Sequence, residues 1–169
     1  YCYTRVGNPT VTAFENRITK LEGGMASIAC ASGMAAIMNA ILNIVRSGDE
    51  IVSSASLYGG SIDLFRDIEE FGIKTRYVKN NDWEAIEGAI NEHTRLLFAE
   101  TIGNPCLDVT DVERLAEIAH AHKIPLILDN TTATAYLFQG LKHGADIVVN
   151  SSSKYINGSS NSISGILTY

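Results

Sequence analysis

Short apolar runs alternate with amphipathic segments along nearly the whole chain, and this alternation restricts the fold more than any other feature. Several runs, such as residues 125–128 and 147–149, are apolar on both faces, which is typical of strands in a sheet that helices cover on both sides. The pattern predicts a three-layer α/β/α fold with a mostly parallel central sheet. No repeat, low-complexity stretch or linker interrupts it, so residues 1–169 are expected to form one domain.

Helices are expected where apolar residues recur at three- and four-residue spacing behind a residue that can cap a helix. A further short helix is expected over residues 136–142, and short runs bounded by turn residues are expected to be strands. The expected capping residues are Asn8, Ser32, Ser61, Asp82 and Thr110. The expected strands are residues 50–53, 74–78, 96–99, 125–128 and 147–149.

Composition and charge argue against several classes of partner. Charged residues make up 19% of the chain, the net charge is −6 and there is no cluster of Lys and Arg, which disfavours nucleic acid and anionic membrane surfaces. No apolar stretch approaches the roughly 20 residues that a membrane span needs. The cysteines Cys2, Cys30 and Cys106 form no CxxC pair and are expected to be free thiols in a reducing cytoplasm. His120 and His122 would point to different sides of a helix, so no metal site is predicted.

The residues that follow the expected strands are the candidates for a ligand site, because such sheets bind ligands beyond the carboxyl ends of their strands. Lys154 follows a buried strand and three serines, where partial desolvation would lower its pKa and suit its amine to Schiff-base chemistry. Asp129 directly follows another buried strand, where it could be an ordinary structural cap. Beside a lysine that holds a pyridine cofactor, its carboxylate would keep the ring nitrogen protonated.

A phosphate could bind at the same edge of the sheet. Ser151 and Ser153 offer hydroxyl donors, and a helix that begins at Gly33 offers its own N–H and that of Met34 at the positive end of the helix dipole. Ordinary turn chemistry would account for either serine as well.

Motifs of other classes of protein find little support. Ser151-x-x-Lys154 matches the S-x-x-K motif of acyl-transfer serine enzymes, but the accompanying S-D-N and K-T-G motifs do not occur. The fingerprint G-x-G-x-x-G, the P-loop and the G-x-S-x-G elbow are absent too. A non-catalytic nucleotide-binding module would fit the α/β pattern but lacks any such glycine fingerprint.

A series of short segments, in order and at family spacing, makes the chain resemble the Cys/Met-metabolism family of fold-type I enzymes, which depend on pyridoxal 5′-phosphate (PLP). The resemblance covers nearly the whole chain. It implies that residues 1–169 form the large PLP-binding domain of an aminotransferase-like fold. The segments are YTR at 3–5, GNPT at 7–10, LEGG at 21–24, ASGMAA at 31–36, LYGG at 57–60, GNP at 103–105, LDNT at 128–131, GADIV at 144–148 and SKYI at 153–156.

The resemblance implies a role for each candidate residue. Lys154 would hold the cofactor through a Schiff base and move protons between substrate carbons, while Asp129 would pair with the pyridinium nitrogen. Tyr58 would stack on the ring and assist deprotonation of the incoming amine, and Asn104 would lie near the ring's 3-oxygen or the substrate carboxylate. A degenerate member with a structural role alone would have lost Lys154 or Asp129, and both are present. The residues that would hold the phosphate are Gly33, Met34, Ser151 and Ser153.

Tyr3 and Arg5 resemble a pair that reaches into the neighbouring subunit's site and binds its phosphate, for which the planar fork of Arg is suited. One subunit alone would then have an incomplete site, so a homo-oligomer, a dimer of dimers, is expected. The chain begins at Tyr1 and ends at Tyr169 inside an apolar run, which suggests that an N-terminal arm and a C-terminal domain are missing. In the family, that C-terminal domain carries an Arg for the substrate carboxylate.

The chain departs from the family pattern at two places. Residues 150–154 read Asn-Ser-Ser-Ser-Lys where the family usually has His-Ser-x-Thr-Lys, so the hydroxyl before the lysine is kept. Residues 157–160 read Asn-Gly-Ser-Ser where many members have Gly-Gly-His-Gly. The sequence does not fix what Asn150, Ser159 and Ser160 do to the local packing.

Two features favour one branch of the family. Gly60 occupies the position where methionine γ-lyases tend to carry Cys, and residues 100–105 read E-T-I-G-N-P, similar to the O-acetylhomoserine sulfhydrylase (thiol-lyase) branch. That branch is expected to catalyse γ-replacement, a transferase reaction of methionine biosynthesis. O-acetylhomoserine loses acetate, and sulfide or a thiol adds at Cγ to give homocysteine or methionine. Because Met34 stands where that branch often has Gln, cystathionine γ-synthase or γ-lyase chemistry is the alternative, with methionine γ-lyase chemistry less favoured.

Overall fold

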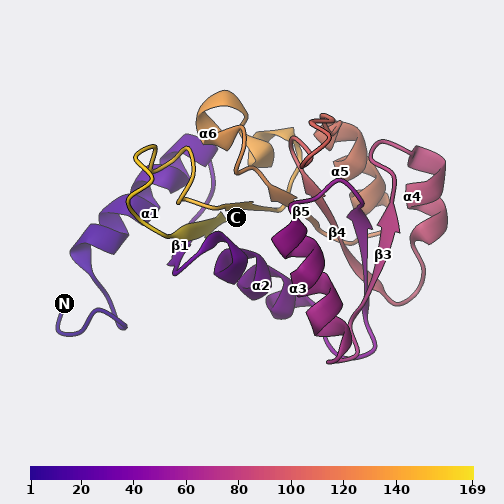
Figure 1. The fold of residues 1–169 in the computed structure, drawn as a ribbon, viewed down its shortest axis with the longest axis horizontal. Coiled ribbons are helices and arrows are strands. Elements are labelled where there is room, and N and C mark those ends of the chain that lie inside the picture. The colour runs from indigo at the N-terminus through magenta and orange to yellow at the C-terminus, as the bar shows by residue number, and fades with distance from the viewer.

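A seven-stranded sheet crosses the molecule, and helices pack on both of its faces (Figure 1). The computed structural model describes residues 1–169. Across the sheet the strands follow the order β1-β7-β6-β5-β4-β2-β3. They are β1 Ser27–Cys30, β2 Glu50–Ser54, β3 Lys74–Val78, β4 Thr94–Glu100, β5 Leu126–Asp129, β6 Ile147–Asn150 and β7 Gly165–Thr168.

Strands β2 to β6 run parallel, which confirms the predicted α/β sheet of mostly parallel strands. β7 pairs antiparallel with both β6 and β1. The sequence did not predict β1 or β7. β1 is a four-residue edge strand with Ile28 half exposed, too short to show an apolar run. β7 returns from β6 without an intervening helix, so it falls outside the strand–helix alternation that indicated the other strands.

Helices α2 and α3 cover one face of the sheet, and α4 and α5 cover the other (Figure 1). Phe98 of β4 packs into the core beneath α2 and α3, while its neighbour Leu97 packs into the core beneath α4 and α5. Each central strand is therefore apolar on both faces, as three layers require. The helices are α1 Pro9–Glu22, α2 Gly33–Ile44, α3 Gly59–Glu69, α4 Trp83–Ala89, α5 Val112–Ala121, α6 Thr134–Leu137 and the 3-10 turn η1 Gly140–His143.

Three of the predicted helix caps are confirmed. The side chains of Asn8, Ser32 and Asp82 each accept a backbone N–H from two or three residues ahead, and so begin α1, α2 and α4. The short helix predicted over residues 136–142 is instead divided into α6 and η1, because Phe138 between them is extended.

Two predicted caps are wrong, because other residues begin those helices. α3 begins before Ser61, whose N–H donates to the carbonyl oxygen of Tyr58 inside the first turn. α5 is capped by Asp111, while the hydroxyl of Thr110 donates to the carbonyl oxygen of Glu100 at 2.6 Å. The threonine that the sequence assigned to a helix thus holds the end of β4.

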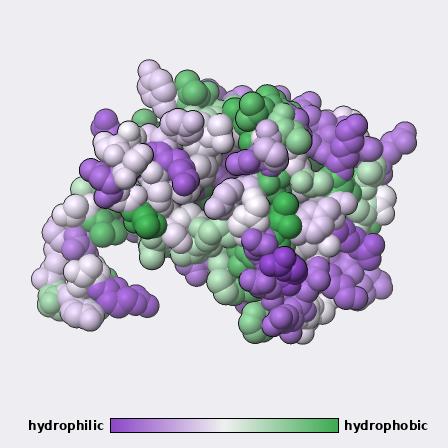
Figure 2. Space-filling view, in the orientation of Figure 1, coloured by the Kyte–Doolittle hydropathy of each residue, from purple (hydrophilic) through white to green (hydrophobic).

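The outer face of α3 is hydrophilic. Asp63, Arg66 and Asp67 form exposed ion pairs there, and hydrophilic side chains gather over this helix in Figure 2. None of the helices combines the length and the apolar run that crossing a membrane would take.

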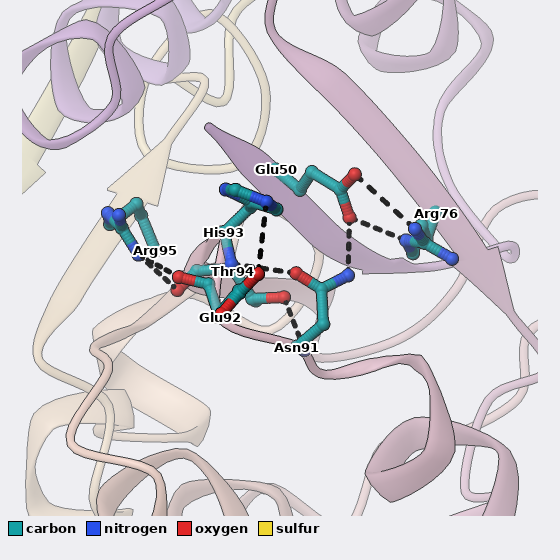
Figure 3. A network of polar contacts seen from close by, with 7 residues as sticks. All are labelled: Glu50, Arg76, Asn91, Glu92, His93, Thr94 and Arg95. Carbon is teal, nitrogen blue, oxygen red and sulfur yellow. Dashed lines mark hydrogen bonds and ion pairs between the residues drawn. The ribbon is translucent and has the colours of Figure 1, made fainter. Parts of the chain in front are cut away.

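At the amino ends of the parallel strands, the buried Glu50 ties three segments together (Figure 3). Its carboxylate accepts hydrogen bonds from Arg76 Nε at 2.6 Å and from Asn91 Nδ2 at 2.7 Å. These bonds, first from Arg76 and then from Asn91, lower the pKa of Glu50 from 4.5 to about 2. They join β2 to β3 and to the segment before β4, at the edge opposite the candidate site, so we assign them to stability.

Replacing Glu50 by Gln is expected to lower the free energy of unfolding at neutral pH, because the amide cannot pair with the guanidinium of Arg76. The pKa of Glu50 is lower in the folded chain, so its stabilisation is present above 4.5 and is lost as the pH falls towards 2. Urea unfolding of the full-length protein measures this between about pH 7 and pH 3. The difference in the free energy of unfolding between variant and wild type should become smaller as the pH falls.

Glu70→Gln, at an exposed carboxylate beyond α3, is the matched control and should show no such trend. A difference between Glu50→Gln and wild type that stays constant over the whole pH range would contradict the pairing of Glu50 with Arg76.

Candidate active site

Polar side chains gather at the edge of the sheet where β2, β4, β5 and β6 end. Because these strands are parallel, their carboxyl ends share this edge, and the antiparallel β7 begins there. Gly33 and Met34 open α2 directly after β1, which runs in the same direction as β6. The other predicted site residues that lie at or just after these strand ends are Tyr58, Asn104, Asp129, Ser151, Ser153 and Lys154.

The start of α2 packs directly against the segment that follows β6. A Cβ on Gly33 would lie 2.6 Å from the Cβ of Ser151 and 2.8 Å from its Cα. A Cβ on Gly165 would overlap the carbonyl oxygen of Ser32 on the other side. The helix comes this close to both strands because positions 33 and 165 have no side chain.

Two N–H groups at the start of α2 have no acceptor in the chain, those of Gly33 and Met34. The next N–H, of Ala35, is bound by the Ser32 hydroxyl at 3.1 Å. Free N–H groups at the start of a helix of 12 residues attract anions, and Ser151 lies against them. This packed corner therefore fits a phosphate group.

The two predicted phosphate serines differ in what they can offer. The hydroxyl of Ser151 makes no hydrogen bond within the chain, while its N–H donates to Thr131 Oγ1 at 2.7 Å. The hydroxyl of Ser153 donates to the carbonyl oxygen of Ser164 at 3.1 Å and accepts the Ser164 N–H at 3.0 Å. Ser153 would have to give up the first of these bonds to donate to a phosphate, so Ser151 is the better placed of the two.

Asp129 ends β5 and is 9% exposed. Its side chain lies on the α2–α3 face of the sheet, because Ile127, two residues earlier, packs into that core. Burial raises the pKa of Asp129, against the hydrogen bond from the N–H of Thr131 at 2.9 Å. A buried carboxylate that receives only neutral donors is suited to a cationic partner such as a protonated ring nitrogen.

Thr131, for which the sequence predicted no role, connects Asp129 to Ser151. Its N–H donates to the carboxyl of Asp129 at 2.9 Å, and its hydroxyl accepts the N–H of Ser151 at 2.7 Å. The segment LDNT contains it, but its role follows only from the pairing of β5 with β6, which places the residues after the two strands side by side.

Glu100 is a second buried carboxylate, and its role was not predicted from the sequence. It ends β4 and is paired in register with Asp129 of β5. Burial raises the pKa of Glu100 to about 7, against a hydrogen bond from the Tyr58 N–H, and the charges of Asp129 and Asp108 add to the rise. Its position directly after the apolar run 96–99 was the only signal in the sequence.

Tyr58 stands at the start of α3 with its side chain half exposed. Its ring lies over Gly60, where a Cβ would be 3.2 Å from Tyr58 Cδ1 and 3.3 Å from Cζ. A side chain at position 60 would therefore push the ring out of this place.

Lys154 and Asn104 are both exposed. The predicted desolvation of Lys154 is wrong within this chain, because the turn after β6 that carries it faces solvent. Asn104 lies in the loop between β4 and α5, which is held to the segment after β2 by a hydrogen bond from Ser56 to Asp108. Both side chains therefore face solvent at this edge of the sheet.

Tyr3 and Arg5 do not lie at this edge of the sheet. Both are exposed in the segment before α1, which extends away from the body of the molecule in Figures 1 and 2. The N–H groups of Val6 and Gly7 donate to the carbonyl oxygen of Tyr3, so the segment is turned, and it makes no backbone hydrogen bond to a strand. Within one chain, these two residues are separate from the site.

The amide of Asn150, where the family usually has His, is buried without a partner for Nδ2 or Oδ1. Its side chain lies on the face opposite to Asp129, because Val148, two residues earlier, packs into the core beneath α4 and α5. This departure therefore lies behind the site, while the other two, Ser159 and Ser160, are exposed.

Comparisons of the sequence with known proteins agree on one family. A profile of the family described as "Cys/Met metabolism PLP-dependent enzyme" matches residues 1–169. An O-acetyl-L-homoserine sulfhydrylase of Leptospira meyeri is 47% identical over 166 residues, which are 98% of this chain and 38% of that protein. The chain thus spans well under half the length of this curated relative.

Two solved structures have closely similar folds. A crystal structure of a Campylobacter jejuni protein, which contains N′-pyridoxyl-lysine-5′-monophosphate, matches with a TM-score of 0.95 and 39% identity, over 98% of this chain and 41% of that one. A cystathionine gamma-lyase of Lactobacillus plantarum, in complex with L-serine, matches with a TM-score of 0.95 and 40% identity, over 99% of this chain and 44% of that one.

Replacing Gly33 by Ala is expected to lower the free energy of unfolding by about 1–3 kcal/mol, because the new methyl group would overlap Ser151. Gly88→Ala in α4 is the matched control, since a Cβ there meets nothing within 4 Å. It should leave stability unchanged or raise it by up to about 1 kcal/mol. Urea unfolding of the full-length protein measures both, and a Gly33→Ala variant as stable as wild type would contradict the close packing of α2.

Proposed function

The chain belongs to the Cys/Met metabolism family of PLP-dependent enzymes, and from this we propose that it uses PLP to exchange the acetate of O-acetylhomoserine for sulfide or a thiol. The products are homocysteine or methionine, and acetate. The observation that carries the proposal is that the buried Asp129 and the free N–H groups of α2 lie at one edge of the sheet, joined through Thr131 and Ser151. These groups match a ring nitrogen and a phosphate, the two ends of the cofactor.

The residues of the edge would divide the binding of the cofactor among them. The N–H groups of Gly33 and Met34 and the hydroxyl of Ser151 would hold the phosphate, with Ser153 joining after it releases Ser164. Asp129 would keep a proton on the ring nitrogen. When bound, PLP supplies an electron sink that makes the substrate Cα and Cβ protons removable.

Lys154, Tyr58 and Asn104 would handle the substrate side. The amine of Lys154, free to move in its exposed turn, would hold the aldehyde of the cofactor and afterwards carry a proton between substrate carbons. Tyr58 would cover the ring, and its phenol would take a proton from the incoming amine. Asn104 would bind the ring's 3-oxygen or the substrate carboxylate.

Local features support γ-replacement over the alternatives. The E-T-I-G-N-P segment of residues 100–105 and the 47% identity to a sulfhydrylase favour this branch. Gly60 supports it too, because methionine γ-lyases tend to carry Cys at this position. Met34 in place of Gln, and the similarity to a cystathionine gamma-lyase, make cystathionine γ-synthase or γ-lyase chemistry the second candidate.

The proposal extends to assembly and location. Residues 1–169 would form the large PLP-binding domain of a longer protein, whose remaining part would bind the substrate carboxylate. The extended segment with Tyr3 and Arg5 would reach the phosphate of a neighbouring subunit, in a dimer of dimers. The free thiols of Cys2, Cys30 and Cys106 suit the cytoplasm.

The test is a product assay on the full-length protein with two substrate pairs, O-acetylhomoserine with sulfide and O-succinylhomoserine with cysteine. Homocysteine from the first pair is expected at a rate at least about tenfold above cystathionine from the second. Lys154→Ala is the control and should form neither product, because no amine holds the cofactor. Cystathionine from the second pair, without homocysteine from the first, would overturn the choice of branch.

A further inference from the structure

Glu100 is a buried carboxylate to which the proposed function assigns no part. No Lys, Arg or His side chain pairs with it, whereas Glu50, buried at the other edge, has Arg76 as its partner. Keeping a carboxylate in such a place is costly unless other groups satisfy it. What Glu100 binds therefore indicates what it does.

The side chain of Glu100 accepts one hydrogen bond, from the backbone N–H of Tyr58 to Oε1 at 2.6 Å. Tyr58 stands immediately before α3, and its own side chain makes no capping bond. The carboxylate from β4 thus takes the place of a cap, at the end of α3 where the helix dipole favours an acceptor. The backbone position of Tyr58 is fixed to a central strand of the sheet.

The ring of Tyr58 lies over Gly60, so the backbone at Gly60 limits the position of the ring on a second side. We propose that Glu100 is a positioning residue: by accepting the N–H of Tyr58, it fixes the tyrosine ring at the cofactor edge of the sheet. The proposal rests on the proposed function in one respect, that Tyr58 contacts the cofactor. The hydrogen bond itself requires no cofactor.

An oxygen of Glu100 makes this contact, and the contact does not require the charge of a carboxylate. Burial, together with the charges of Asp129 from β5 and Asp108 from the loop after β4, favours the neutral acid, while the Tyr58 N–H at the start of α3 favours the carboxylate. An acid or a carboxylate can accept the N–H through Oε1. Glu100→Gln keeps such an oxygen, and Glu100→Met fills similar space without one.

The first measurement is hydrogen exchange of the peptide that contains Tyr58, in the full-length protein without cofactor. Glu100→Met should speed exchange of the Tyr58 amide about tenfold or more, and Glu100→Gln should leave it within about threefold of wild type. Peptides of α5 report whether the fold is intact, and Glu100→Ala is the second variant if Glu100→Met does not fold. Unchanged exchange in the folded variants would overturn the proposal.

The second measurement is the dissociation constant of PLP in a double-mutant cycle with Tyr58→Ala. Glu100→Met should weaken binding about tenfold when Tyr58 is present and no more than about twofold in the Tyr58→Ala background, while Glu100→Gln should bind within about threefold of wild type. The proposal would be overturned if the losses of PLP affinity caused by Glu100→Met and Tyr58→Ala add independently. It would also be overturned if Glu100→Gln weakens PLP binding as much as Glu100→Met does. A wild-type protein that binds no PLP would refute the proposed function and leave the exchange measurement to decide the role of Glu100.

Discussion

The direct contact between the first residue of α2 and Ser151 is the constraint on which the site depends. It brings α2 against β6 and β7, which come much later in the sequence, and it exists because residues 33 and 165 have no side chain. The contact leaves two helix N–H groups beside a serine hydroxyl, with no acceptor in the chain. Serines and glycines at turns are common, so the case for phosphate binding comes from this packing and not from their chemistry alone.

The parallel register of β4 and β5 adds the second element, a pair of buried carboxylates side by side. Burial raises the pKa of both Glu100 and Asp129, and both are held by neutral donors, Tyr58 and Thr131. Neither carboxylate therefore has a positively charged partner, and the protonated ring nitrogen of PLP would supply one. Their separate partners give them separate parts: Asp129 is left for the ring, and Glu100 is tied to the tyrosine that would cover it.

The sequence predicted the parts of this structure that depend on local patterns. Strands apolar on both faces, such as residues 96–99, show the three layers directly, and the residues after them show the edge where ligands bind. Contacts between distant segments could not be predicted from local patterns. β1 and β7 are neighbours in the sheet although they lie near opposite ends of the chain, and Ser164, which binds Ser153, lies in a loop without a local pattern. The parts of Thr131 and Glu100 likewise follow from strand pairing.

The most direct test of the central claim is to map the lysine that holds the cofactor. The full-length protein is mixed with PLP, reduced with borohydride and digested, and its peptides are read by mass spectrometry. We predict that the pyridoxyl group is found on Lys154, in the turn that follows β6. A pyridoxyl group on a different lysine, or on none, would contradict the placement of the cofactor at this edge of the sheet.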